Sequence, residues 1–297
     1  MTDRFASSAH IAPGGTFTLP GGRSISRLGF GAMRIVGKGV WGDPEDPAEV
    51  RRVLARLPAL GVDFIDTADS YGPFTSEDLI REVLYGDSHQ PYGGMLVATK
   101  GGFTRHGPDI WEEVGRPEYL RLCVLLSMRR LGVERIVLWQ LHRIDPLVPA
   151  DEQFDVMRAM QQEGLIGLLG LSEVSVPQIE AAGRYFQVAT VQNRYNLGDR
   201  KSEDVLRHCE AHGIGFIPWH PLEAGRRTSR SVVERIAKAH GATAGQVALA
   251  WLLQTSPVML PIPGTGKVAH LEENMAAAGL LLAPHEISEL DALGTGL

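Results

Sequence analysis

Four side chains that can donate, accept or stabilise a proton stand at or just after short apolar segments of the chain: Asp66, Tyr71, Lys100 and His142. When a hydride reduces a carbonyl carbon, the oxygen must take up a proton. A tyrosine hydroxyl can supply that proton, although its unperturbed pKa is about 10. A lysine ammonium lowers that pKa, and a buried aspartate holds the lysine charged. A histidine can orient the carbonyl or relay protons.

Each of these residues also has a purely structural alternative when it is taken alone. Asp66 could cap a turn, and Lys100 could be a solvated charge at a strand end. Tyr71 could pack within a loop, and His142 could be a hydrogen-bonded structural residue. Their common position at the carboxyl ends of predicted strands favours function, because active sites of α/β barrels lie on that face.

Short apolar segments alternate with amphipathic segments, which indicates a parallel sheet with crossover helices. The predicted strands are Leu28–Met33, Phe64–Asp66, Met95–Lys100, Ile136–Leu141, Ile166–Ser172, Ala189–Asn193, Gly215–Trp219 and Val258–Pro261. The predicted helices are Pro47–Leu60, Thr75–Leu84, Pro117–Leu131, Asp151–Glu163, Val176–Tyr185, Lys201–His212, Ser231–His240 and Val268–Gly279. Such units, joined by right-handed crossovers, close into a (β/α)8 barrel.

Three segments fall outside this repeat. Thr16–Leu19 and Arg23–Ile25 flank a Pro-Gly-Gly turn and predict a β-hairpin before the barrel. Thr243–Leu253 and Pro284–Leu290 predict extra helices near the C-terminus. Because no linker or low-complexity block interrupts the pattern, we expect residues 1–297 to form one domain.

Residues at helix ends give more local signals. Asp151 is expected to cap the helix that it begins, and Gly132 and Gly213 are expected to end two others. Pro177 falls in a first turn, where its missing N–H is harmless.

The bulk composition excludes several classes of function. Lys plus Arg total 29 and Asp plus Glu 35, giving a net charge of −6, which does not attract nucleic acid or anionic membranes over long range. No apolar run is long enough to span a membrane, and the first residues do not look like a signal peptide. We expect a cytoplasmic protein with Cys123 and Cys209 as reduced packing residues, and no metal site, because no ligand spacing is evident.

Three stretches of the sequence resemble signatures of the aldo-keto reductase family. They are Gly61–Gly72, Met160–Ile166 leading into Leu169–Ser172, and Pro261–Lys267 continuing to Glu273–Asn274. The resemblance covers roughly residues 14 to 292 in order. It implies a barrel that reduces a small aldehyde or ketone with NADPH. It also implies that Tyr71 is the general acid, with Asp66, Lys100 and His142 beside it.

The same resemblance implies how NADP is held, since no dinucleotide-binding glycine fingerprint follows a predicted strand. Ser172 and Gln192 match positions that bind the nicotinamide carboxamide, and Trp219 matches an aromatic that stacks on the nicotinamide ring. A core aromatic is the structural alternative for Trp219. The implied cofactor residues are Gly31, Ala32, Met33, Asp66, Ser172, Gln192, Trp219, Pro221, Leu222, Ile262, Gly264, Thr265, Lys267, His270, Glu273 and Asn274.

The chain departs from the family pattern at several of these places. Glu173 stands where asparagine is common, and His220 where serine is frequent. His270 replaces a frequent arginine, and Gly264 replaces a lysine found in some relatives. The resemblance then leaves Thr265, Lys267 and His270 to bind the 2′-phosphate, near a helix N-terminus that suits anions. These changes weaken the expected preference for NADP over NAD.

Within the family, the sequence most resembles the bacterial pyridoxal reductases, through residues 29–33, 39–42, 80–85, 246–254 and 270–275. These residues belong mostly to the scaffold and cofactor loops. The expected substrate pocket comprises Trp41, Phe74, Phe103 and Arg143, with Val40 and the loop 222–228. Its aromatic walls suit a planar aromatic aldehyde. Arg143 and Arg226 could contact a phosphate or an acid, or could be solvated surface residues.

Two other functions remain open at this stage. The chain could oxidise sugars or other alcohols with NADP, because the sequence does not set the direction of the reaction. It could also be an NADP-binding regulatory subunit with little turnover, although the retention of all four proton-handling residues argues against this. The oligomeric state is not indicated.

Overall fold

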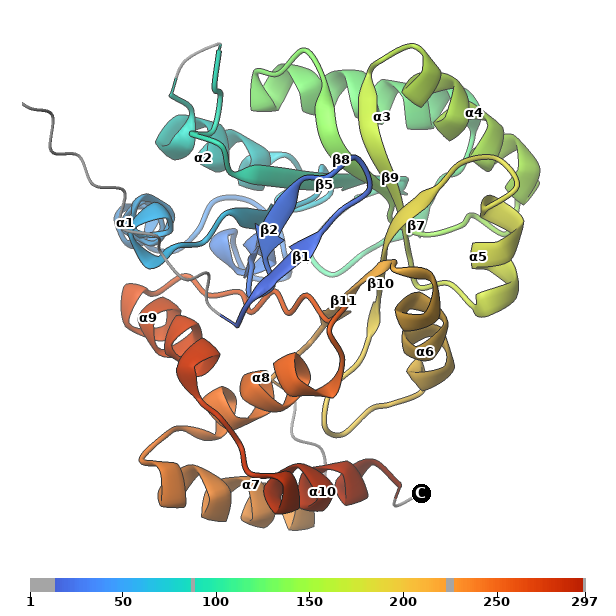
Figure 1. Cartoon of the computed structure of the whole chain (residues 1–297). Helices are drawn as coiled ribbons and strands as arrows, with labels where there is room; N and C mark the ends of the chain where they lie inside the picture. Colours follow the sequence, from blue (N-terminus) through green and yellow to red (C-terminus); the bar gives the residue numbers. More distant parts are fainter. Residues whose placement is uncertain (1–13, 87–88, 223–226, 296–297) are drawn as a thin grey trace, which may run out of the picture.

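A computed structural model describes residues 14–86, 89–222 and 227–295, the last range including 227–230 and 295 in backbone only. A parallel sheet of seven strands, in the order β11-β10-β9-β8-β5-β4-β3, lies at its centre (Figure 1). The strands are β3 (Phe30–Gly31), β4 (Phe64–Asp66), β5 (Leu96–Gly101), β8 (Ile136–Leu141), β9 (Ile166–Ser172), β10 (Val188–Arg194) and β11 (Gly215–Trp219). The sheet and its order confirm the predicted α/β class.

The eighth predicted strand, Val258–Pro261, is not a regular strand, but it joins the two edges of the sheet. Phe216 of β11 donates its N–H to the Val258 carbonyl at 2.8 Å and accepts the Leu260 N–H at 2.8 Å. On the other side, the Gly29 N–H donates to the Pro261 carbonyl at 2.9 Å. Prolines interrupt a regular ladder here because they lack an N–H. The segment nevertheless closes the ring of a (β/α)8 barrel.

Helices surround this ring (Figure 1). They are α1 (Pro47–Arg56), α2 (Thr75–Leu84), α3 (Pro117–Leu131), α4 (Ala150–Gln162), α5 (Val176–Ala182), α6 (Glu203–His212), α7 (Arg227–His240), α8 (Ala244–Thr255), α9 (Val268–Ala276) and α10 (Pro284–Ala292). The predicted extra helices are α8 and α10, and α10 packs beside α7. No described helix is long and apolar enough to cross a membrane.

The local signals at helix ends were mostly correct. Gly132 and Gly213 end α3 and α6 in the left-handed conformation, at φ 68° and 66°, which glycine adopts without strain. Pro177 lies in the first turn of α5. The predicted cap Asp151 was wrong, because α4 already begins at Ala150 and Pro149 occupies the cap position. Asp151 instead lies in the first turn, where its charge still favours the helix.

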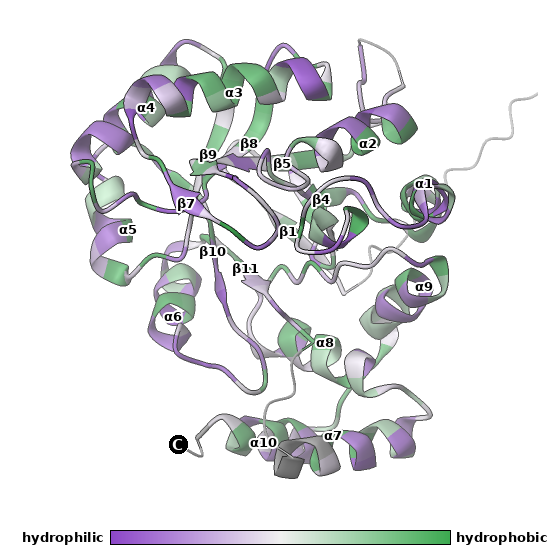
Figure 2. Ribbon diagram, turned by 180° about the vertical axis from the view of Figure 1, so that it is seen from behind, coloured by the Kyte–Doolittle hydropathy of each residue, from purple (hydrophilic) through white to green (hydrophobic). Residues whose placement is uncertain are grey.

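Two short hairpins flank the ring. The predicted N-terminal hairpin is confirmed as β1 (Thr16–Thr18) paired antiparallel with β2 (Ser24–Ser26). The second, β6 (Phe103–Thr104) with β7 (Glu112–Glu113), was not predicted, because strands of two residues show no periodicity. Figure 2 shows the hydrophilic β7 inside the ring of helices. Both cysteines are free and buried, as expected.

Arg27 ties the start of the barrel to the end of α8. Its guanidinium donates to the carbonyls of Gly14 at 3.2 Å, Ser256 at 2.7 Å and Leu253. Its Nε donates to the Met259 carbonyl at 3.3 Å. Leu253 and Ser256 lie at the C-terminal end of α8, where a cation is favourable. Met259 lies in the closing segment, and Gly14 precedes β1.

Replacing Arg27 should therefore destabilise the fold. We expect Arg27→Ala to lower the free energy of unfolding by about 2–4 kcal/mol, because several part-buried carbonyls lose a charged donor. Urea denaturation followed by circular dichroism measures this change. The control is Arg51→Ala, which breaks only the exposed ion pair with Glu82 and should cost about 0–1 kcal/mol. Equal losses in the two variants would contradict a role for Arg27 in closing the barrel.

Candidate active site

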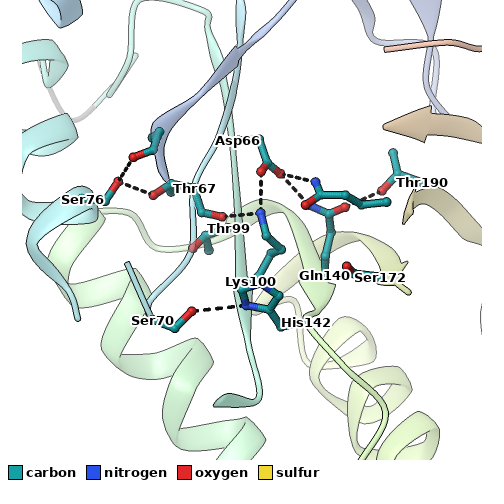
Figure 3. Close-up of polar contacts among 12 residues, drawn as sticks. Asp66, Thr67, Ser70, Ser76, Thr99, Lys100, Gln140, His142, Ser172 and Thr190 are labelled. Carbon is teal, nitrogen blue, oxygen red and sulfur yellow. Dashed lines mark hydrogen bonds and ion pairs between the residues drawn. The ribbon is translucent and has the colours of Figure 1, made fainter. Parts of the chain in front are cut away.

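A buried ion pair lies at the carboxyl end of the central strands (Figure 3). The Lys100 Nζ donates to Asp66 Oδ1 at 2.5 Å, and the two side chains are 0% and 2% exposed. Lys100 also donates to the Thr67 carbonyl at 2.9 Å. The alternative of a solvated Lys100 is thereby excluded. Such a buried pair is stable only when its remaining polar atoms are satisfied.

Two glutamines satisfy the other oxygen of Asp66. The Nε2 atoms of Gln140 and Gln192 donate to Asp66 Oδ2 at 2.9 and 3.0 Å. Thr190 in turn donates to Gln140 Oε1 at 3.3 Å. Lys100 and Gln140 are direct partners on the neighbouring strands β5 and β8, so their side chains point to the same side of the sheet. Gln140 and Thr190 were not predicted as site residues.

Tyr71 lies in the loop after β4, next to this pair, and is buried. The Lys100 Nζ is 5.3 Å from the centre of its ring. Burial raises the pKa of Tyr71, and the charge of Lys100 lowers it by a smaller amount, so that the net pKa lies above its usual value. The expected lowering of the Tyr71 pKa by Lys100 is present, but burial has the larger effect, because it desolvates the phenolate.

His142 directly follows β8 and is buried against Tyr71, with ring centres 5.9 Å apart. Its Nδ1 lies 3.3 Å from Ser70 Oγ. Burial lowers the pKa of His142 well below 6.5, and the charges of Lys100, Arg143 and Arg105 lower it further. The imidazole is therefore neutral at physiological pH, which leaves it one N–H donor and one acceptor.

A cavity of about 520 Å³ opens beside these groups. Its walls are formed by Gly31, Met33, Arg34, Asp66, Tyr71, Phe103, Trp111, Glu113, His142, Arg143, Ser172, Gln192, Trp219, His220, Pro221, Leu222, Ile262, Pro263 and Gly264. Most of the predicted cofactor residues line it. The predicted residues Ala32, Thr265, Lys267, His270, Glu273 and Asn274 do not, and the last five lie beyond its Gly264 end in sequence.

The predicted substrate pocket coincides with this cavity only in part. Phe103 and Arg143 line the cavity, whereas Trp41 and Phe74 do not. Phe74 is 43% exposed and lies under Arg130, 4.2 Å from its guanidinium carbon. The backbone of Trp41 forms an isolated parallel β-bridge with that of Gly72. Arg226 falls outside the described residues.

Several residues of the cavity wall were not predicted from the sequence, among them Arg34, Trp111 and Glu113. Trp111 lies just before β7, and its ring centre is 5.4 Å from that of Phe103. The Arg105 guanidinium lies 3.6 Å above its ring and donates to the carbonyls of Ser70 at 2.7 Å and Ile110 at 2.7 Å. Arg105 thus joins the loop of Trp111 to the loop of Tyr71. An aromatic residue in the loop after the Lys100 strand was the available signal.

Glu173, the residue that replaces the usual asparagine, points to the neighbouring strand ends. Its Oε1 accepts the Trp219 indole N–H at 2.5 Å and the Arg194 backbone N–H at 2.7 Å. Glu173 itself has a φ of 54°, a left-handed conformation that is uncommon for a non-glycine residue. Its carboxylate therefore links the ends of β9, β10 and β11 and fixes the orientation of Trp219.

The start of α9 is already partly occupied by a carboxylate. Glu49 of α1 accepts the Val268 N–H at 2.8 Å, and Thr265 Oγ1 accepts the Lys267 N–H at 3.1 Å. The side chains of Lys267 and His270 are exposed. The side chains of Lys267 and His270, more than free backbone amides, are thus available to an anion here. Within the described residues, no three His, Cys, Asp or Glu side chains form a group that could hold a metal.

The sequence is similar to known oxidoreductases over nearly its whole length. It is 50% identical to an uncharacterized oxidoreductase of Schizosaccharomyces pombe over 295 residues, covering 99% of this chain and 95% of the relative. It is 39% identical to the pyridoxine 4-dehydrogenase of Escherichia coli over 285 residues, covering 94% and 98%.

Solved structures share the fold. A thermostable aldo-keto reductase in complex with the inhibitor epalrestat matches with a TM-score of 0.81 and 28% identity, over 94% of this chain and 99% of that one. An aldo-keto reductase of Klebsiella pneumoniae in complex with NADPH matches with a TM-score of 0.76 and 24% identity, over 94% of both chains. The aldo/keto reductase family model matches residues 27–295. The chain therefore belongs to the aldo/keto reductase family of oxidoreductases.

Proposed function

We propose that the chain reduces an aldehyde or ketone to an alcohol with NADPH, and that Tyr71 is the general acid. The observation that carries this proposal is the buried Asp66–Lys100 pair beside Tyr71 and a neutral His142, at the wall of one cavity. These groups supply a proton donor, a charge that stabilises the donor after it loses the proton, and a second hydrogen-bonding group for the carbonyl.

Bound NADPH would supply the hydride. Tyr71 then protonates the carbonyl oxygen as negative charge develops there. Its raised pKa keeps the hydroxyl protonated at neutral pH, so that it is ready to act as an acid. Lys100 is held charged by Asp66 and stabilises the tyrosinate that remains. The neutral His142 can donate one N–H to the carbonyl oxygen and so orient it.

The cavity fits the proposed cofactor at both ends. Ser172, Gln192 and Trp219 line the cavity together with Tyr71. The first two would bind the carboxamide, and the Trp219 ring would stack on the nicotinamide. At the other end, the cation Arg34 lies beside Gly264 and suits a pyrophosphate. Beyond it, Thr265, Lys267 and His270 would bind the 2′-phosphate, and Glu273 and Asn274 would lie near the adenine.

Pyridoxal is the candidate substrate that we propose to test first. One relative is named for pyridoxine oxidation, and the rings of Phe103 and Trp111 form an aromatic wall next to Tyr71. Oxidation of sugars or other alcohols is the second candidate, because the same groups work in reverse. The close grouping of the four proposed proton-transfer residues argues against the third candidate, a low-turnover regulatory subunit.

Replacing Tyr71 tests the proposed function. Tyr71→Phe keeps the ring and removes only the hydroxyl, so turnover should fall by about 10²–10⁴ while NADPH still binds. Consumption of NADPH with pyridoxal and with 4-nitrobenzaldehyde measures turnover, and cofactor fluorescence measures binding. Near wild-type turnover would remove Tyr71 from the mechanism and make His142 the next candidate acid.

The loss of turnover in Tyr71→Phe should depend on whether Lys100 is present. Lys100→Met should also reduce turnover, and the double variant should lose much less than the product of the two single effects, because both residues act through one proton transfer. Fully additive losses would show that the two residues act independently. Thermal unfolding of each variant is the control for folding, because Lys100→Met leaves the buried Asp66 without its ion partner.

Preference for NADPH over NADH should depend on Lys267. The Val268 N–H already donates to Glu49 and is not free to bind a phosphate. A 2′-phosphate would therefore rely on the side-chain charge of Lys267. We expect Lys267→Ala to weaken NADPH binding about tenfold and to leave NADH binding nearly unchanged. The control Lys238→Ala removes an exposed cation on α7 and should affect neither cofactor. Equal weakening for NADPH and NADH would contradict recognition of the 2′-phosphate by Lys267.

Glu173 should position Trp219 for the cofactor. Glu173→Asn is too short to keep both hydrogen bonds, so we expect NADPH affinity to fall about three- to tenfold. Glu173→Gln keeps an acceptor oxygen and should restore most of the affinity. In a Trp219→Phe background, Glu173→Asn should have little further effect. An undiminished effect in that background would show that Glu173 does not act through Trp219.

A further inference from the structure

Arg143 is a cation in the cavity wall without an ion-pair partner among the described residues. It follows His142 directly, and its Nη1 donates to the His142 carbonyl at 2.6 Å and to Ser172 Oγ at 2.9 Å. Both acceptors are uncharged. None of the hydrogen bonds found in the described part of the chain uses its Nη2 or Nε, and neither atom is both buried and unsatisfied. These donors are therefore available to a ligand.

The surrounding charges do not fully compensate Arg143. Glu173 and Glu113 attract the guanidinium, but burial has the larger effect and lowers the pKa of Arg143 below its usual value. Glu173 is already bonded to Trp219 and to the Arg194 backbone, and Glu113 is exposed. Lys100, the cation closest to Asp66, is neutralised by that carboxylate. The positive charge of Arg143 is therefore left for an anion to neutralise.

This cation lies beside the reacting groups and an aromatic wall. Its guanidinium carbon is 5.7 Å from the centre of the Phe103 ring, and Phe103 packs on His142 with ring centres 4.6 Å apart. The charge of Arg143 also acts on the Tyr71 hydroxyl. A ring that lies against Phe103 with its carbonyl at Tyr71 and His142 would therefore carry its nearest substituent close to Arg143.

We propose that Arg143 binds an anionic oxygen on the substrate, and that the preferred substrates are aromatic aldehydes with this anionic group ortho to the carbonyl. The inference rests on the proposed function, because Tyr71 and His142 define where the carbonyl lies. A guanidinium suits the task, since its planar donors can hold two oxygens at once. A group para to the carbonyl would point away from Arg143.

The test compares three aldehydes that differ in one carboxylate: benzaldehyde, 2-carboxybenzaldehyde and 4-carboxybenzaldehyde. The wild type should show the highest kcat/KM for the 2-carboxy isomer. Arg143→Met should lower the ratio of kcat/KM for 2-carboxybenzaldehyde to that for benzaldehyde about 10- to 100-fold, mainly through KM. Arg143→Lys should recover part of this ratio. Glu113→Gln removes an opposing charge and should raise kcat/KM for the 2-carboxy isomer.

An unchanged ratio in Arg143→Met would overturn the proposal. An equal loss for all three aldehydes, together with weaker NADPH binding, would also overturn it and would assign Arg143 to the cofactor through Ser172. Equal preference for the 2- and 4-carboxy isomers would overturn the ortho placement.

A binding measurement separates this proposal from the proposed function. Quenching of tryptophan fluorescence by 2-carboxybenzaldehyde, with NADP⁺ present, reports binding without turnover. If the wild type turns over none of the aldehydes, the proposed function fails, and the anion site still stands or falls on this titration. Tighter binding of 2-carboxybenzaldehyde than of benzaldehyde, lost in Arg143→Met, supports the site. Equal binding of the two aldehydes overturns it.

Discussion

The structure of the site depends on one buried ion pair. Asp66 and Lys100 lie almost without solvent contact, and each charge would be costly to bury alone. Hydrogen bonds from Gln140 and Gln192 and to the Thr67 carbonyl satisfy their remaining polar atoms. These bonds join β4, β5, β8 and β10 across the barrel. Removing one partner leaves an uncompensated charge, at a cost of about 3–5 kcal/mol, so the same contacts serve stability and chemistry.

The charge of Lys100 affects the ionisation of its two neighbours, Tyr71 and His142, in opposite ways. It favours the ionised form of Tyr71 and disfavours the ionised form of His142. Both effects arise from one cation in a poorly solvated site, where charges act more strongly than in water. These opposite effects agree with the roles proposed for the two residues, Tyr71 as the proton donor and His142 as a neutral hydrogen-bonding group. A single buried charge thus shifts the ionisation of its two neighbours in opposite directions.

The sequence predicted what depends on local pattern and missed what depends on packing. The strands are recognisable as short series of apolar residues. The end of Phe64–Asp66 indicates Asp66, and the end of Ile136–Leu141 indicates His142. Trp111 lies in a loop whose path is set by Arg105 and by contacts with Phe103, which no periodicity reports. Trp41 was misplaced for the same reason. The net pKa of Tyr71 also required the structure, because burial and the Lys100 charge oppose each other.

The rim of the cavity shows how one departure from the family pattern is accommodated. The left-handed backbone at Glu173 turns its carboxylate toward Trp219 and Arg194, so the side chain offers nothing to a carboxamide. Ser172 remains at the wall, and its hydroxyl oxygen already accepts from Arg143. The Ser172 hydrogen would then donate toward the proposed cofactor, while Arg143 keeps other donors for the proposed anionic group of the substrate. Under the proposed function, cofactor and substrate would share the Ser172 hydroxyl, because a shift of either ligand would reorient the same hydrogen bond.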